Sequence, residues 1–335
     1  MLRIYLTEPA LHQTNIMKTG SGINSKPDYR FRLAFAALIL ITPFFFWGGP
    51  DDYSARAVKE IWNTGHIFYF ALATWLLLKW KYVSRQSFGR QVMVILFILL
   101  VAGTLIELLQ SGLQRTPDIN DVLRDMTGSV LVLLFIASRA QKVSRPGRAV
   151  LQATALIILF IQFWPLAVIL IDDAISSERF PVLSDFESPF EGGRWSGSAL
   201  RVIEKSPDGT TGDAMRITFS TAKFSSVDLK YFHGDWRGYS YLKFSFFYPG
   251  KRSTSIVCRI HDLEHLQGKQ QYEDRYNQAF LLRPGWNRIS INLKVVASSP
   301  RNRKMDMKQI RGAGFFTMSL PSSQTLYLDD VRLSH

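Results

Sequence analysis

The sequence has little cysteine: Cys258 is the single one among 335 residues. An intrachain disulfide is therefore excluded, and each domain must be stabilised by its own apolar core. Beyond residue 172 the sequence also lacks a P-loop, a dinucleotide-binding glycine motif, a metal-ligand spacing pattern and the Ser-His-Asp order of serine hydrolases. No familiar catalytic motif is therefore present in that half of the chain.

Acidic residues are in the minority, with 27 Asp and Glu against 40 Lys and Arg and a net charge of +13. Such a charge can indicate a nucleic-acid partner, but basic residues in short loops between apolar spans produce the same sum. The hydrophobic residues, 47% of the chain, are concentrated in its first half. We therefore attribute the positive charge to membrane topology and expect no nucleic acid among the partners.

Five apolar segments approach or reach the roughly 20 residues that a helix needs to cross a bilayer. In lipid a helix is favoured because it satisfies its own backbone hydrogen bonds. The segments are residues 33–47, 61–78, 92–109, 122–138 and 150–171. The first is short and the fourth begins with charged residues, so four spans remain an alternative. We predict an α-helical transmembrane bundle of about five helices over residues 33–171.

The connections between these segments differ in charge. Residues 1–32, 79–90 and 139–148 are rich in Lys and Arg, whereas the opposite connections are diluted by Asp and Glu. Since cytoplasmic loops are enriched in basic residues, we expect the tail of residues 1–32 in the cytoplasm. An odd number of crossings then places everything after residue 171 outside. No small-residue cleavage site follows the first segment, so we interpret it as an uncleaved anchor in the cytoplasmic (inner) membrane.

Polar residues occur at similar depth in three of the predicted spans, near their outer ends. Ionisable residues are costly in lipid and commonly mark a function or a buried pairing. Some of them are three or four positions apart and therefore share a helix face. The predicted polar membrane cluster consists of His66, Glu107, Gln110, Arg115, Asp118, Asp121 and Asp125. The alternative is an ion-pair network that only holds the helices together.

The order of these residues, completed by Gly128, resembles the signature of VanZ-like membrane proteins over about residues 33–140. That signature has a Glu-x-x-Gln, an Arg, two Asp and an Asn-x-x-Gly, with a His on an earlier span. Asp125 stands where the family usually has Asn. The resemblance implies a role in the cell envelope, linked to resistance against a glycopeptide antibiotic of the teicoplanin type, without supplying a mechanism.

After Asp172 the long apolar runs stop, and short alternating segments separated by Gly, Pro, Ser, Asn and Asp begin. Their spacing favours an all-β jelly-roll sandwich over residues 185–335, joined to the bundle by a linker at 172–184. The candidate strands are residues 200–204, 214–219, 226–231, 241–248, 255–261, 277–282, 287–293, 312–318 and 324–333.

This domain resembles carbohydrate-binding modules of the galactose-binding-like type. The matching features are an opening Asp-Phe-Glu, Trp236 before a strand, the turn Pro-Gly-Trp-Asn at 284–287 and the closing strand at 327–333. In that fold the opening acidic pair and the closing strand often hold a structural calcium ion. Asp185, Glu187 and Asp329 are suitable oxygen donors for this single candidate cofactor.

Sugar recognition needs flat aromatic surfaces next to polar side chains. The sequence offers this mixture in two stretches, and each could instead be a surface strand with its loop. The predicted glycan-binding residues are Arg259, His261, Asp262, Tyr272, Tyr276 and Trp236.

We therefore predict a cell-envelope protein whose bundle binds a lipid-linked or amphiphilic molecule at the outer interface, while its outer domain binds a glycan. One alternative is an intramembrane enzyme acting on a lipid-linked glycan or phosphate, with His66 or Glu107 as general base and Arg115 neutralising the phosphate. Another is an envelope scaffold whose sandwich binds protein. The sequence is compatible with both a binding protein and an enzyme.

Overall fold

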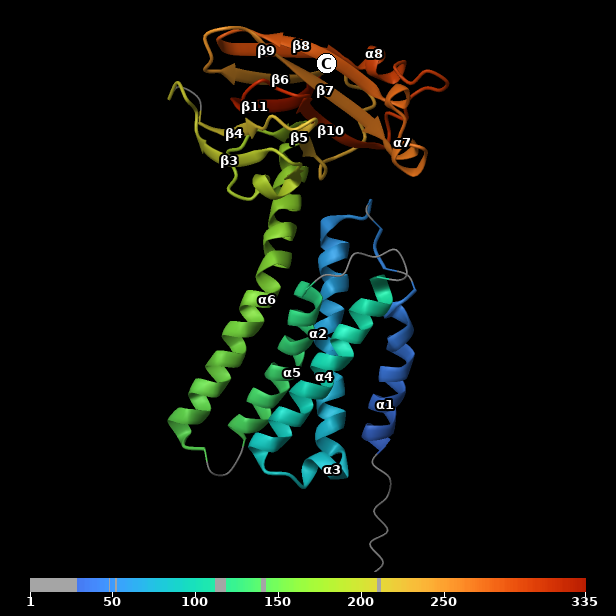
Figure 1. Ribbon diagram of the computed structural model, residues 1–335, viewed down its shortest axis with the longest axis vertical. Helices are drawn as coiled ribbons and strands as arrows, with labels where there is room; N and C mark the ends of the chain where they lie inside the picture. Colours follow the sequence, from blue (N-terminus) through green and yellow to red (C-terminus); the bar gives the residue numbers. More distant parts are fainter. Residues whose placement is uncertain (1–28, 48, 52, 112–118, 140–142, 210–211) are drawn as a thin grey trace, which may run out of the picture.

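The computed structural model describes residues 29–47, 49–51, 53–111, 119–139, 143–209 and 212–335. A helical bundle forms one end of the molecule and a β-sandwich the other (Figure 1). The predicted fold class is therefore confirmed: an N-terminal helical region is followed by an antiparallel sandwich of two sheets.

Within the described residues the bundle contains five longer helices, and successive ones run in alternate directions (Figure 1). They are α1 (Tyr29–Ile41), α2 (Arg56–Lys79), α4 (Phe88–Ser111), α5 (Ile119–Ser138) and α6 (Arg145–Arg179), with the short η1 (Thr42–Phe45) and α3 (Lys81–Ser84) between them. Among the described residues, three segments are long and apolar enough to cross a membrane: α2, Phe88–Gln110 of α4, and α6. These three candidate spans indicate a membrane protein.

The other two helices fall short of a span for different reasons. α1 has only 13 residues, which is less than a bilayer requires. α5 is long enough, but Asp121, Arg124 and Asp125 all lie within its 20 residues. The predicted count of about five spans thus becomes three candidates by length and composition, and the orientation of the bundle stays a prediction.

The surface of the bundle suits a lipid environment. Phe97 of α4 is 68% exposed, and Ile157 and Phe160 of α6 are 59% and 64% exposed. Large apolar side chains gathered in this way are unfavourable in water.

Between the helices, Gly128 of α5 lies so close to α2 that a Cβ atom there would meet the backbone oxygen of Ile67. Small residues permit such close helix packing in membranes.

The sandwich consists of a six-stranded and a five-stranded sheet. The first has the order β3-β4-β11-β6-β9, with β1 paired to β11, and the second has the order β2-β5-β10-β7-β8. The strands are β1 (Val182–Ser184), β2 (Trp195–Ser196), β3 (Leu200–Lys205), β4 (Asp213–Phe219), β5 (Ser225–Leu229), β6 (Tyr241–Tyr248), β7 (Thr254–Asp262), β8 (Tyr276–Leu282), β9 (Gly285–Asn292), β10 (Ile310–Thr317) and β11 (Gln324–Ser334). Aromatic side chains fill the space between the sheets: the ring centroid of Phe315 lies 4.8 Å from that of Phe244 and 4.9 Å from that of Phe246.

The two domains meet without an extended connection. The segment 172–184, predicted as a linker, consists of the last turns of α6 followed by β1. Here the buried carboxylate of Asp172 binds Arg56 of α2 at 2.5 Å and Arg194 of the sandwich at 2.6 Å. Arg194 ends the short helix η2 (Glu191–Arg194). We name Arg56, Asp172 and Arg194 the junction cluster.

Candidate functional site

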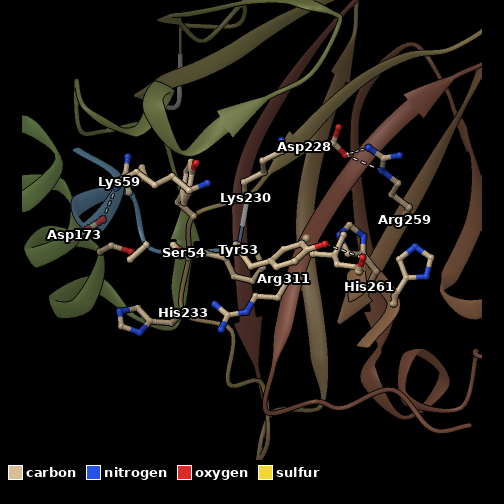
Figure 2. Close-up of a pocket in the computed structure, with 18 of the residues that line it drawn as sticks. Tyr53, Ser54, Lys59, Asp173, Asp228, Lys230, His233, Arg259, His261 and Arg311 are labelled. Carbon is tan, nitrogen blue, oxygen red and sulfur yellow. Dashed lines mark hydrogen bonds and ion pairs between the residues drawn. The ribbon is translucent and has the colours of Figure 1, made fainter. Parts of the chain in front are cut away.

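A cavity of about 680 Å³ lies between the five-stranded sheet and the adjoining ends of α2 and α6 (Figure 2). The helical part of the chain contributes Tyr53, Ser54, Arg56, Lys59, Asp173 and Ser177. The sandwich contributes Asp228, Lys230, Arg259, His261, Arg275 and Arg311, among others. In Figure 2, Lys59 and Asp173 lie on the side opposite Arg259 and His261, and Tyr53 and Arg311 lie between them.

The alternation of β7 explains why polar residues reach this cavity. Its buried residues, Ile256 and Ile260 among them, point into the core, so Arg259 and His261 point to the other face of the sheet. The register places Arg259 opposite Gly314 of β10, and His261 opposite Gly312.

These two glycines of β10 leave room for the functional side chains. A Cβ atom on Gly312 would collide with the ring of His261, and one on Gly314 would collide with the carboxylate of Asp228. Gly312 itself lines the cavity. A Gly within a strand commonly marks such a close approach. Because Gly312 and Gly314 have no side chains, His261 and Asp228 can occupy the space above them on this face of the sheet.

The cavity is positively charged. Among the described residues that line it, six are Arg or Lys and two are Asp. Both acids are already in ion pairs at 2.5 Å, Asp173 with Arg56 and Asp228 with Arg259. The side chains of Lys230 and Arg311 are exposed, and neither forms an ion pair within the described part of the chain. A positive surplus therefore remains for an anionic ligand.

Two further residues have unusual protonation properties. Burial, and after it the charge of Arg259, lowers the pKa of Arg275, whose buried Nε lacks a hydrogen-bond partner within the described residues. Burial, followed by the charges of His265 and Arg259, lowers the pKa of His261 to about 3. His261 is therefore neutral at pH 7, with one ring nitrogen as donor and the other as acceptor.

Aromatic rings complete the lining. Tyr53, which precedes α2, reaches across to the sandwich and donates its hydroxyl hydrogen to the backbone oxygen of Leu266 at 2.8 Å. The guanidinium of Arg56 lies 5.1 Å from the ring centroid of Tyr231. Aromatic faces next to charged and neutral hydrogen-bonding groups are the combination that a sugar ring requires.

Of the predicted glycan-binding residues, the structure brings Arg259 and His261 to the cavity. Asp262, Tyr276 and Trp236 do not line this cavity and are only 0%, 3% and 1% exposed. Asp262 accepts hydrogen bonds from Arg303, and Tyr276 and Trp236 belong to the core between the sheets. Tyr272 is exposed but lies outside this cavity.

The predicted polar membrane cluster is partly assembled. His66 Nδ1 lies 2.8 Å from Asp125 Oδ1, and His66 Nε2 lies 3.9 Å from Asp121 Oδ2. On α4, Glu107 is buried and Gln110 donates a hydrogen bond to the backbone oxygen of Phe45.

Arg115 and Asp118 lie outside the described residues. Within the residues that the structure describes, no group of three or more His, Cys, Asp or Glu side chains has an arrangement that would hold a metal ion.

The predicted calcium donors lie at the start and end of the sandwich. Asp185 pairs with Arg179 at 2.7 Å, and Glu187 accepts a hydrogen bond from the backbone of Asp213. Burial, and after it the charges of Asp330, Asp185 and Glu187, raises the pKa of Asp329 to about 6. The carboxylates therefore repel one another, but Asp185, Glu187 and Asp329 are not among any group of described residues arranged to hold a metal ion, so the calcium site stays a prediction from the sequence alone.

Comparison with known proteins identifies no family. No family model matches the sequence, so the VanZ-like resemblance is not established, and no curated protein matches it.

Among solved structures, the C-terminal sandwich is similar to a family 11 carbohydrate-binding module from Clostridium thermocellum in complex with a mixed-linked tetrasaccharide. The two are 15% identical, the match covers 46% of this chain and 94% of that chain, and the TM-score is 0.36. A non-crystalline cellulose specific module, CBM28, shows 11% identity over 47% of this chain and 93% of that one, with a TM-score of 0.33. An exo-beta-agarase shows 13% identity over 46% of this chain, but over only 25% of that one, with a TM-score of 0.37.

Most residues of the cavity were not predicted from the sequence, Tyr53, Lys230 and Arg311 among them. Each is an ordinary residue in its own segment, and they become neighbours only through the docking of the sandwich on the bundle. The alternation of buried and exposed residues along β7 is a pattern visible in the sequence, and it indicates only that Arg259 and His261 lie on the same face.

Proposed function

We propose that the protein is a membrane-anchored receptor that holds a glycan against the outer surface of the membrane, in the cavity between the sandwich and the bundle. The observation that carries the proposal is the cavity itself, which has walls from both domains. Its volume of about 680 Å³ lies within the range typical of ligand-binding sites. The predicted orientation of the bundle puts this cavity at the outer headgroup level.

The chemistry of the lining supports a sugar as the ligand. Tyr53 and Tyr231 supply aromatic surface for the C–H face of a sugar ring. Neutral His261 lines the cavity, and a neutral ring nitrogen can either donate to or accept from a sugar hydroxyl. Because the cavity lies directly against the ends of α2 and α6, its ligand is one that resides at the membrane surface.

The proposal is tested by binding measurements on the full chain in lipid nanodiscs, with a panel of fluorescent oligosaccharides. We expect Tyr53→Ala to weaken the binding of any oligosaccharide that binds by about tenfold, the loss typical of one good contact. Tyr241→Ala is the matched control, because Tyr241 is 37% exposed on the six-stranded sheet and does not line the cavity. Equal losses in both variants, or a panel without a binder, would contradict the proposal.

A second candidate is catalysis on a lipid-linked glycan, and the His66–Asp125 contact of 2.8 Å favours it. If Nδ1 donates to Asp125, Nε2 is left as a general base, which is the arrangement that many hydrolytic enzymes use. Labelled lipid-linked glycan incubated with the purified protein tests this candidate. Product formation that persists in His66→Ala protein would rule out His66 as the base. A role in glycopeptide resistance rests on the sequence resemblance alone.

A further inference from the structure

We infer that the glycan held in the cavity carries a phosphate group, which is bound by Lys230, Arg275 and Arg311. This inference deepens the proposed function and rests on it. It specifies that the ligand is a phosphorylated glycan rather than a neutral one.

The distribution of charge is the first argument. A neutral sugar needs donors and acceptors but no net charge, whereas the lining has six basic and two acidic residues among those described. Ion pairs within the protein account for both acids, with Arg56 and with Arg259. The positive charges of Lys230, Arg275 and Arg311 are not compensated in this way, and gathering them in one cavity costs free energy unless an anion binds.

The state of Arg275 is the second argument. Its Nε is buried and has no hydrogen-bond acceptor within the described residues, and its guanidinium stacks on the ring of Tyr272 with a centroid distance of 5.6 Å. A buried donor without an acceptor is costly, and a ligand oxygen would remove that cost. The pKa of Arg275 is lowered by burial and then by the neighbouring charge of Arg259, so an anion here would also relieve repulsion.

The geometry favours phosphate over carboxylate. A carboxylate is planar and is commonly bound through both oxygens by one Arg. The three basic residues come from separate segments: Lys230 follows β5, Arg275 precedes β8 and Arg311 lies on β10. Basic side chains on separate segments of one cavity suit a group with several acceptor oxygens, such as a phosphate. α2 adds to this effect, since its positive end begins at the lining residue Ala55, whose side chain provides no cap.

The position of the cavity is compatible with two kinds of phosphate-containing ligand. A lipid-linked glycan carries phosphate between sugar and lipid, and the predicted orientation would bring that phosphate to the level where α2 and α6 meet the sandwich. A soluble envelope polymer with phosphodiester links presents the same chemistry from the aqueous side. Both sources share the group that Lys230, Arg275 and Arg311 would bind.

The test uses the full chain in phosphatidylcholine nanodiscs. The soluble probe is a fluorescent oligomer of glycerol phosphate, the lipid probe is polyprenyl phosphate incorporated in the nanodisc, and an oligogalacturonate of equal charge is the carboxylate comparison. The variants are Lys230→Glu and Arg311→Glu, whose side chains are exposed, so that folding is preserved. Arg252→Glu makes the same change of charge at an exposed position between β6 and β7, outside the cavity.

We expect at least one phosphate probe to bind more tightly than the oligogalacturonate. We also expect Lys230→Glu and Arg311→Glu to weaken that binding about tenfold or more, while Arg252→Glu changes it less than about twofold. Which probe binds distinguishes the lipid source from the soluble one. Equal binding of phosphate and carboxylate, or equal effects of Arg311→Glu and Arg252→Glu, would overturn the inference.

The inference and the proposed function fail in different ways. If neutral oligosaccharides bind in a manner that depends on Tyr53 while neither phosphate probe binds, the inference is wrong and the proposed function stands. If a phosphate probe binds but every oligosaccharide fails, the cavity is a phosphate site and glycan binding is contradicted.

Discussion

Arg194 of the sandwich binds the carboxylate of Asp172 on α6, with 2.6 Å between Nη2 and Oδ1 and both side chains buried. The same carboxylate accepts a hydrogen bond from Arg56 of α2. One acidic residue therefore joins two helices and the sandwich.

The junction cluster predicts a large effect of a small substitution. Asp172→Asn removes the charge that both guanidinium groups share, and removing one partner of a buried pair costs about 3–5 kcal/mol. We expect a loss of that order in the free energy of unfolding, measured by denaturant titration in detergent. The control is Asp173→Asn: Asp173 is 44% exposed, so its loss should cost less than about 1 kcal/mol. Equal effects of the two variants would contradict this role of Asp172.

The contact between α2 and α5 predicts opposite effects of two glycine substitutions. Gly128→Ala places a Cβ atom against the backbone of Ile67, and overpacking of this kind costs about 1–3 kcal/mol. Gly65→Ala in α2 meets nothing within 4 Å, so the better helix propensity of Ala should make it neutral or stabilising by up to about 1 kcal/mol. Thermal unfolding of the purified chain in detergent measures both. A stable Gly128→Ala protein would show that the helices are further apart than described.

Asp329 predicts a dependence of stability on pH and calcium. Its pKa is raised to about 6 from an ordinary value of 3.8, so the folded state binds the proton more tightly. The contribution of Asp329 to stability is therefore full below about pH 4 and is lost as pH rises to 6 and above. Because the side chain is only half-buried, we expect Asp329→Asn to stabilise the calcium-free protein at pH 7 by about 1 kcal/mol.

The calcium arm of that experiment tests the predicted donors. If Asp185, Glu187 and Asp329 bind calcium, the ion should raise the melting temperature of the parent protein at pH 7 and have little effect on Asp329→Asn. At pH 4 the parent and the variant should be equally stable. Stabilisation of both proteins by calcium to the same extent would place the ion elsewhere.

The orientation of the chain can be tested with introduced cysteines. Cys258 is fully buried and burial raises the pKa of its thiol, so it should not react in the native protein. Ser322→Cys adds an exposed thiol on the sandwich, and Ser87→Cys adds one at the opposite end of the bundle. In intact cells we expect a membrane-impermeant thiol reagent to label position 322 and to spare position 87 until the membrane is opened. The reverse pattern would place the cavity in the cytoplasm.

Much of the sandwich was predictable because its strands alternate. Each of the nine predicted strands overlaps one of β3 to β11, and the prediction for 241–248 has the same bounds as β6. β1 and β2 were missed, since segments of three and two residues are too short to show a period. Their pairing partners, which are β11 and β5, lie far along the chain.

The candidate site was harder to predict than the fold. Alternation shows that Arg259 and His261 share a face of β7, but not that α2 and α6 cover this face. Trp236 and Tyr276 are of residue types that often bind sugars, but both are buried by packing between the two sheets. Composition therefore identifies residues capable of recognition, and only tertiary packing decides which of them a ligand can reach.

The most direct test of the account is photo-crosslinking in intact cells, with a photo-reactive phenylalanine analogue in place of Tyr53 or, as the control, Tyr241. We predict that the protein substituted at position 53 captures saccharide-containing material, detected by glycan labelling after purification, and that Arg311→Glu reduces the capture. Position 241 should capture none. Equal capture at both positions, or none at position 53, would contradict a glycan site between the sandwich and the membrane.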